Sequence, residues 1–92
     1  MTVADEISVI RVRANSNPRA VAGSITKILE DGKTAEVQTI GAGALNQATK
    51  AIAMSRGFVA NKGRDAVVRP GFGDTEIDGK QKTLIRQFVS YN

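Results

Sequence analysis

Residues 39–58, TIGAGALNQATKAIAMSRGF, join an expected strand to an alanine-rich helix through Gly41, Ala42 and Gly43. A strand, a glycine turn and a helix start can hold a phosphate on free backbone N–H groups at the positive end of the helix. The dinucleotide-binding fingerprint, however, requires a third glycine where Asn46 stands, and the P-loop's Gly-Lys-Ser/Thr does not follow this turn. We therefore interpret the glycines first as a tight turn with close helix packing, and phosphate binding is the alternative.

Two arginines precede this turn and share one face of an expected strand. Residues 7–14, ISVIRVRA, alternate from Val9 onward, so that Ile10, Val12 and Ala14 share one face and Arg11 and Arg13 the other. On an open sheet surface such arginines can bind backbone phosphates. The alternative is a solvated face on which they pair with polar residues of neighbouring strands. The candidate partners there are Glu36, Gln38 and Arg86.

The segment that follows this strand has polar residues at a predicted helix start. Ser16, Asn17 and Arg19 could bind a phosphate there. The alternative is helix capping, because Ser16 or Asn17 suits the N-cap position and Pro18 suits the first helical position.

A predicted hairpin carries charges of both signs. Its basic candidates for contacting nucleic acid are Arg69, Lys80 and Lys82. Its acids alternate along the same strand pair at Asp74, Glu76 and Asp78. The mixture favours a solvated hairpin with cross-strand charge pairs over a uniformly basic arm. A metal site on the three acids is disfavoured, because the ligand spacing of a calcium-binding loop is missing.

Composition limits the chemistry further. The 92 residues contain no histidine and no cysteine, which removes the commonest general base, the commonest metal ligand and any disulfide. Net charge is +4, which permits a nucleic-acid or acidic partner without requiring one. No apolar run is long enough to cross a bilayer, and two acids stand near the N-terminus where a signal peptide needs basic residues. We expect a cytoplasmic protein that is not an enzyme and uses no cofactor.

These residues are positioned by a predicted β-α-β-α-β-β order in a single domain, residues 1–92, with a core at about residues 7–91. The fold class is α/β in the sense of an α+β sandwich: a four-stranded mixed sheet with two helices on one face. Strands are predicted at 7–14 and 34–40, and a hairpin turns at Asp78-Gly79. Helices are predicted at 18–31, closed by Gly32, and at 44–56, closed by Gly57. Pro70-Gly71 predicts a bulge or an edge position.

The second predicted helix has a row of small residues. Its members are Ala44, Ala48, Ala51 and Ser55. Small side chains allow close helix approach, so this row is the candidate oligomer interface. The alternative is that the row packs on its own sheet.

Three stretches together resemble one known family. They are SNPRAVAGSI, AEVQTIGAGALNQATKAIAMSRGFVA and FGDTEIDGKQKT, and the similarity runs from about residue 7 to residue 89. The chain resembles the stage V sporulation protein S family. This resemblance implies an Alba-like fold, a role in sporulation and its regulation, and a nucleic-acid-binding activity. The wider Alba superfamily implies small basic proteins that act as dimers.

The resemblance also implies where a ligand would bind: the loop before the first helix, the start of the second helix and the hairpin arms. Where Alba proteins have a lysine pair before the proline, this chain has Ser16-Asn17, and Gly41-Ala42-Gly43 stand where they have arginine. The candidate binding residues are therefore Arg11, Arg13, Ser16, Asn17, Arg19, Gly41, Gly43, Asn46, Lys50, Arg69, Lys80 and Lys82.

The leading hypothesis is a regulator that binds DNA or RNA as a homo-oligomer, a dimer or tetramer. A protein-interaction module that kept the fold but lost nucleic-acid binding is the alternative. A small-ligand sensor using the Gly41–Gly43 turn is a third possibility.

Overall fold

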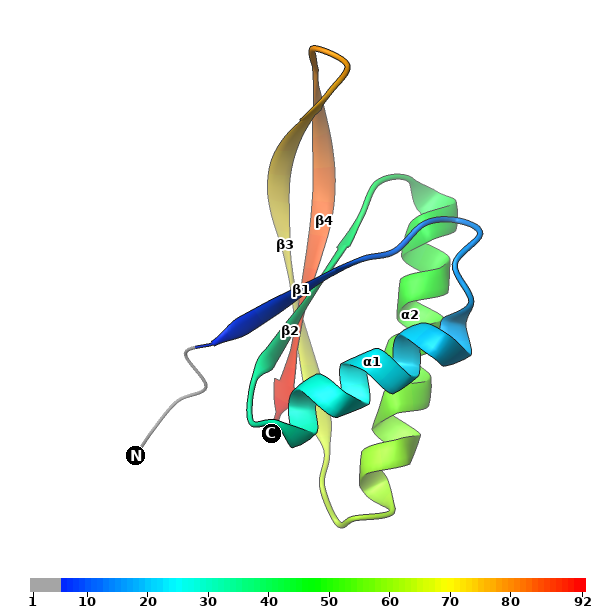
Figure 1. The fold of residues 1–92 in the computed structure, drawn as a ribbon, viewed down its shortest axis with the longest axis vertical. Helices are drawn as coiled ribbons and strands as arrows, with labels where there is room; N and C mark the ends of the chain where they lie inside the picture. Colours follow the sequence, from blue (N-terminus) through cyan, green and yellow to red (C-terminus); the bar gives the residue numbers. More distant parts are fainter. Residues whose placement is uncertain (1–5) are drawn as a thin grey trace.

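The computed structural model describes residues 6–92 and arranges them as a mixed sheet with two helices on one face (Figure 1). The elements in order are β1 (Ile7–Arg11), α1 (Pro18–Glu30), β2 (Thr34–Thr39), α2 (Ala42–Ala60), β3 (Ala66–Ile77) and β4 (Lys80–Tyr91). The strand order is β1-β2-β4-β3, with β1 parallel to β2 and the other neighbours antiparallel. The predicted element order and fold class are confirmed.

The limits of α1 follow from local sequence. Asn17 is the N-cap, and its Oδ1 accepts hydrogen bonds from the N–H groups of Arg19 (2.9 Å) and Ala20 (3.3 Å). Pro18 takes the first helical position, where the missing N–H costs nothing. Gly32, at φ +77°, ends the helix as predicted, because a left-handed backbone favours glycine.

The second helix is longer than predicted. Gly57 was expected to end it, but α2 continues to Ala60. The reason is Val59, which is fully buried and holds the last turn against the core. Gly63, at φ +74°, lies just beyond the helix, where the N–H of Arg64 bonds back to the carbonyl of Val59.

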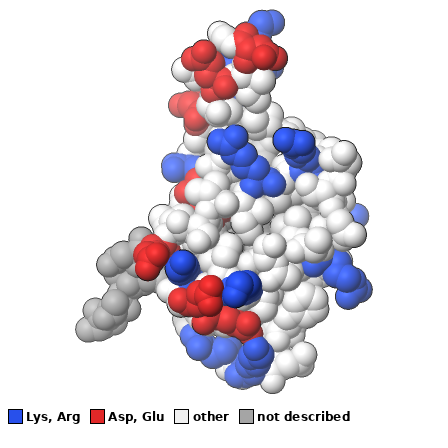
Figure 2. Space-filling model, in the orientation of Figure 1, with Lys and Arg blue, Asp and Glu red and all other residues white. Residues whose placement is uncertain are grey.

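The hairpin of β3 and β4 projects from the rest of the sheet (Figure 1). Asp78 and Gly79 both have positive φ, +52° and +76°, as a two-residue hairpin turn requires. Pro70 lies on the edge strand, as expected, and its pairing with Gln87 continues the ladder without a bulge. Acidic residues gather at the tip of the hairpin (Figure 2).

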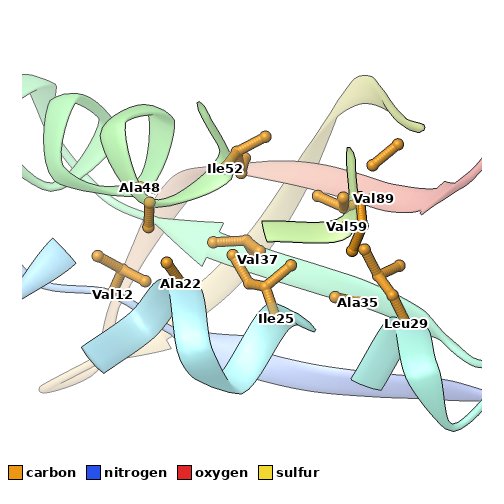
Figure 3. Close-up of a cluster of buried hydrophobic side chains, with 12 residues drawn as sticks. Val12, Ala22, Ile25, Leu29, Ala35, Val37, Ala48, Ile52, Val59 and Val89 are labelled. Carbon is orange, nitrogen blue, oxygen red and sulfur yellow. The ribbon is translucent and has the colours of Figure 1, made fainter. Parts of the chain in front are cut away.

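The core lies between the helices and one face of the sheet (Figure 3). Ile25 and Leu29 of α1 are fully buried, and they lie with Val37 of β2 and Val89 of β4. None of the largest core residues is aromatic, so aliphatic packing supplies most of the buried surface.

The small-residue row of α2 belongs to this core. Ala44 is 4% exposed, and Ala48, Ala51 and Ser55 are 0% exposed. The assignment of these four side chains to an oligomer interface is therefore corrected. They let α2 approach its own sheet and α1, and no side-chain surface is left for a second copy.

Candidate nucleic-acid interface

The end of β1 presents two arginines to solvent. Val12 is buried, and its N–H donates to the Gln38 carbonyl at 3.0 Å, so the chain stays beside β2 for one residue beyond β1. Because Val12 points inward, Arg11 and Arg13 are exposed on either side of it. In the sheet register Arg11 lies beside Gln38, which lies beside Arg86.

The expected pairing of these arginines with an acid does not form. Glu36 lies beside Val9 instead, and one of its carboxylate oxygens accepts a 2.7 Å hydrogen bond from Gln38 Nε2. Within residues 6–92, neither Arg11 nor Arg13 has a carboxylate within 4.0 Å. Both guanidinium groups are therefore available to an external anion.

One of the two polar loop residues is used for helix capping, which was the alternative interpretation. Asn17 caps α1, whereas Ser16 Oγ accepts a 2.8 Å hydrogen bond from the Arg13 N–H within the loop. Their side chains therefore hold the loop in place, while Arg19 in the first turn of α1 remains exposed. Of this group, Arg19 carries a cation that forms no salt bridge within residues 6–92.

The start of α2 docks against the same loop. A Cβ atom at Gly43 would lie 3.1 Å from the Cβ of Ala14, a separation tighter than normal packing allows. Gln47 Nε2 donates a 2.9 Å hydrogen bond to the Ser16 carbonyl. The close-packing interpretation of Gly43 is thus confirmed. This packing places the Gly41–Gly43 turn beside the loop that carries Arg13.

The same turn leaves backbone donors free. Gly41 is the N-cap of α2, at φ +88°, and no side chain among residues 6–92 caps this helix. The first helical hydrogen bond runs from the Leu45 N–H to the Gly41 carbonyl, so the preceding N–H groups, on residues 42–44, have no partner within the helix. Unpartnered N–H groups at the positive end of a 19-residue helix favour an anion.

Asn46 and Lys50 lie further along α2. They are exposed and stand four residues apart, so they share one face of the helix. We define the basic surface as Arg11, Arg13, Arg19 and Lys50, which flank the starts of the two helices.

The hairpin candidates do not form one cluster with this surface. Arg69 lies opposite Phe88 on β3, the edge strand away from β1, so two strands separate it from Arg11. Lys80 and Lys82 lie near the tip, opposite Ile77 and Thr75.

The expected cross-strand charge pairs are also absent from the hairpin. The residues directly opposite its lysines are uncharged, and no salt bridge within residues 6–92 involves Asp74, Glu76 or Asp78. The reason is register, because each acid faces Thr83, Gln81 or the turn rather than a lysine.

A cavity of about 360 Å³ lies between the β1 end, the β2 end, the start of α2 and the hairpin. Its walls include Arg11 and Arg13, which the sequence singled out as binding candidates. They also include Thr39, which it did not single out, and Glu76, which it considered only as an acid of the hairpin. Thr39 ends β2 just before the glycine turn, and this position was the one available signal for it. Glu76 carries no such signal, because only the twist of the hairpin brings it here.

Ion pairs gather elsewhere on the molecule. They join Lys33 to Glu6 (3.7 Å), Arg56 to Asp65 (2.9 Å) and Lys62 to Glu30. A hydrogen bond from Arg56, with a second from the Ala66 N–H, lowers the pKa of the Asp65 carboxyl. Hydrogen bonding to Glu30 likewise raises the pKa of Lys62.

The lysine and arginine side chains of the surface therefore fall into two groups, those that lie close to acids and those that do not. Some lysine and arginine side chains lie close to acids near the end of α1, whereas others stand apart from acids below the hairpin tip (Figure 2). In the described part of the chain, no member of the basic surface forms a salt bridge. Free cations near uncapped backbone donors form the arrangement best suited to binding phosphates.

In comparison with known families, residues 8–92 match the family model described as Stage V sporulation protein S. The match covers nearly the whole chain and contains every candidate binding residue. No helix in residues 6–92 is long and apolar enough to cross a membrane.

Proposed function

The chain belongs to the stage V sporulation protein S family, a family of sporulation-related proteins, and on this premise we propose that it is a non-enzymatic regulator that binds nucleic acid. One observation carries the proposal: the cations that flank the helix starts, beside an α2 start with no side-chain cap, form no salt bridge within residues 6–92. Such cations bind the phosphate backbone and contribute affinity without reading sequence.

In this proposal the protein acts as a dimer, and the two copies of the basic surface bind the same nucleic acid. Exposed apolar side chains on the strands support association. Val9 on β1 is 54% exposed, and Phe72 on β3 is 75% exposed. Both lie on edge strands, which also present unpaired backbone groups. The dimer contact is therefore assigned to the strands rather than to the small-residue row of α2.

The proposal is tested by titrating fluorescently labelled duplex DNA, single-stranded DNA and RNA at low salt. If each engaged protomer neutralises about four phosphates, the logarithm of the duplex binding constant falls against the logarithm of salt concentration with a slope of about −3.6 per engaged protomer. Light scattering on the same samples should give the mass of a dimer. Failure to bind all three nucleic acids at low salt would exclude the proposed function.

A protein-interaction module is the second candidate function. The observation that favours it is the hairpin, where the acidic tip adjoins Phe72 and Ile77, which are 75% and 45% exposed. In that case the hairpin binds a basic, partly apolar protein surface. Removing the charges of Arg11 and Arg13 would then leave activity in cells intact, whereas it abolishes activity if nucleic acid is the partner.

A further inference from the structure

The sheet face opposite the two helices, here called the open face, is not covered by any helix of residues 6–92 (Figure 1). Its side chains alternate along each strand with those that point to the core. Three of them are arginines, Arg11 on β1, Arg86 on β4 and Arg69 on β3. Within residues 6–92 none of the three forms a salt bridge. The open face therefore offers positive charge on three of its strands.

The acid content of the open face is low. On the four strands its one acid is Glu36, which is 8% exposed and accepts a 2.7 Å hydrogen bond from Gln38 Nε2. Two copies stacked through this face would bring their arginines together, and like charges across an interface are unfavourable. A polyanion complements the charge of this face better than a second copy does.

Arg86 is held in place on the open face. Its Nε donates a 2.9 Å hydrogen bond to the Phe72 carbonyl of the neighbouring strand, and its Cζ lies 5.2 Å from the centre of the Phe88 ring. The N–H groups on its terminal nitrogens take no part in that bond. A positioned guanidinium beside an aromatic ring is a surface on which an unpaired nucleic-acid base can stack.

Two glycines of β3 make room for this arrangement. Gly71 pairs with Arg86 and Gly73 with Leu84, so both lie beside it on the open face. A Cβ atom at Gly73 would lie 2.7 Å from Leu84 Cδ1 and 3.1 Å from Arg86 Cδ, so these side chains would have to move. Glycine inside a strand often marks a place where a ligand approaches the backbone closely. We define the stacking platform as Gly71, Gly73, Arg86 and Phe88.

A hydrogen-bond acceptor lies next to the stacking platform. Gln38 is beside both Arg11 and Arg86 in the sheet register. Because its Nε2 donates to Glu36, its Oε1 is turned away from that carboxylate and can accept a hydrogen bond from a ligand. The ribose 2′-hydroxyl is a donor that RNA has and DNA lacks. This acceptor therefore favours RNA as the ligand.

We propose that the stacking platform binds single-stranded RNA, an inference that rests on the proposed function and names its substrate class. An unpaired base stacks on Arg86 and Phe88. Arg11 and Arg69 bind phosphates of the same strand, and Gln38 accepts a hydrogen bond from a 2′-hydroxyl. In a duplex the bases stack on one another, so they do not reach such a platform.

The stacking platform is compatible with the proposed dimer. Phe72 points to the other face of β3, because neighbouring residues of a strand point to opposite faces. Val9 lies on β1, and β2 separates it from Phe88. A dimer contact through Phe72 and the edge of β1 leaves the stacking platform accessible.

Two variants test the stacking platform, with fluorescence anisotropy as the measurement. Arg86→Lys keeps the charge and removes the planar guanidinium, and Phe88→Leu keeps an apolar side chain and removes the ring. Each should weaken binding of a short, unstructured RNA strand about fivefold or more, the effect of losing one stacked base. Each should leave binding of duplex DNA unchanged, because neither residue belongs to the basic surface.

Matched controls make the same changes elsewhere. Arg64→Lys also removes an arginine that lies over an aromatic ring, because Arg64 Cζ is 3.7 Å from the centre of the Tyr91 ring, which packs against the core. Phe58→Leu removes a ring that is 38% exposed on α2. Both should bind the RNA strand like the unaltered protein. Thermal unfolding will check that all four variants fold, and Arg86→Lys decides alone if Phe88→Leu does not.

The unaltered protein should bind the RNA strand more tightly than duplex RNA or a DNA strand of the same sequence. The proposal is overturned if the folded platform variants bind the RNA strand as tightly as their controls, or if duplex RNA binds equally well. Equal affinity for the DNA strand would overturn the assignment to RNA. In each case binding of duplex DNA would still support the proposed function, whereas loss of binding to every nucleic acid would contradict both.

Discussion

Neutralising Arg11 and Arg13 together, as Arg11→Gln with Arg13→Gln, lowers the affinity for duplex DNA about 60-fold at 0.1 M salt for each protomer that engages the duplex. Each lost phosphate contact removes about 0.9 logarithmic units of counterion-release affinity between 1 M and 0.1 M salt, so two contacts in one protomer remove about 1.8. The salt slope should become shallower by the same amount, about 1.8 per engaged protomer. Fluorescence anisotropy over a range of salt concentrations measures both quantities.

The control for this experiment removes the same charge elsewhere. Lys27→Gln with Lys33→Gln neutralises two cations outside the basic surface, at the end of α1 and just before β2. Affinity and slope should then change little. Equal losses in the two double variants would show that net charge alone drives binding, and unchanged binding in the arginine variant would remove Arg11 and Arg13 from the interface.

Leu29→Ala should produce the largest loss of stability. Leu29 is fully buried in α1 and belongs to a core built of aliphatic residues. Truncating a buried leucine costs about 2–5 kcal/mol, a large share of the 5–15 kcal/mol that a native domain has. In a chain of this size each kcal/mol shifts Tm by about 4–8 °C, so a fall of about 10–30 °C is expected.

Thermal and urea unfolding followed by circular dichroism will measure this loss. The urea midpoint should fall while the slope of the transition stays the same, because the substitution leaves the surface area exposed on unfolding almost unchanged. Ser24→Ala, at an exposed position of the same helix, is the control and should change Tm little. A Leu29→Ala protein as stable as Ser24→Ala would show that the core is not packed as described.

Local sequence signals predicted most of the fold. Asn17-Pro18 and Gly32 limit α1 correctly, and Asp78-Gly79 forms the predicted turn. Each of these signals depends on backbone preferences of the residue itself, which act over a few positions. The predicted end of the second helix was wrong because tertiary packing determines it. The buried side chain of Val59 extends α2 past Gly57.

The small-residue row shows a second limit. Ala48 and Ala51 allow close approach by any neighbouring element, and the sequence does not say whether that neighbour belongs to the same chain. In the structure, both side chains are fully buried inside the monomer. The pattern predicts close packing correctly, but it does not identify the partner.

The candidate site was predicted in part. Exposure of Arg11 and Arg13 follows from strand alternation, and capping by Asn17 follows from residue type. Thr39 and Glu76 meet in one cavity only because β2 ends beside a twisted hairpin. Contacts between residues that are far apart in the chain leave no periodic pattern in a single sequence.

The most direct test of the account is ¹H–¹⁵N correlation NMR of the labelled protein during titration with short nucleic acid at low salt. The account predicts that the largest amide shifts fall in residues 11–20 and 41–50, which contain the basic surface and the glycine turn. Residues 56–65, where Arg56, Lys62 and Asp65 form ion pairs, should shift little. Shifts centred on residues 56–65, or none anywhere at saturating nucleic acid, would contradict it.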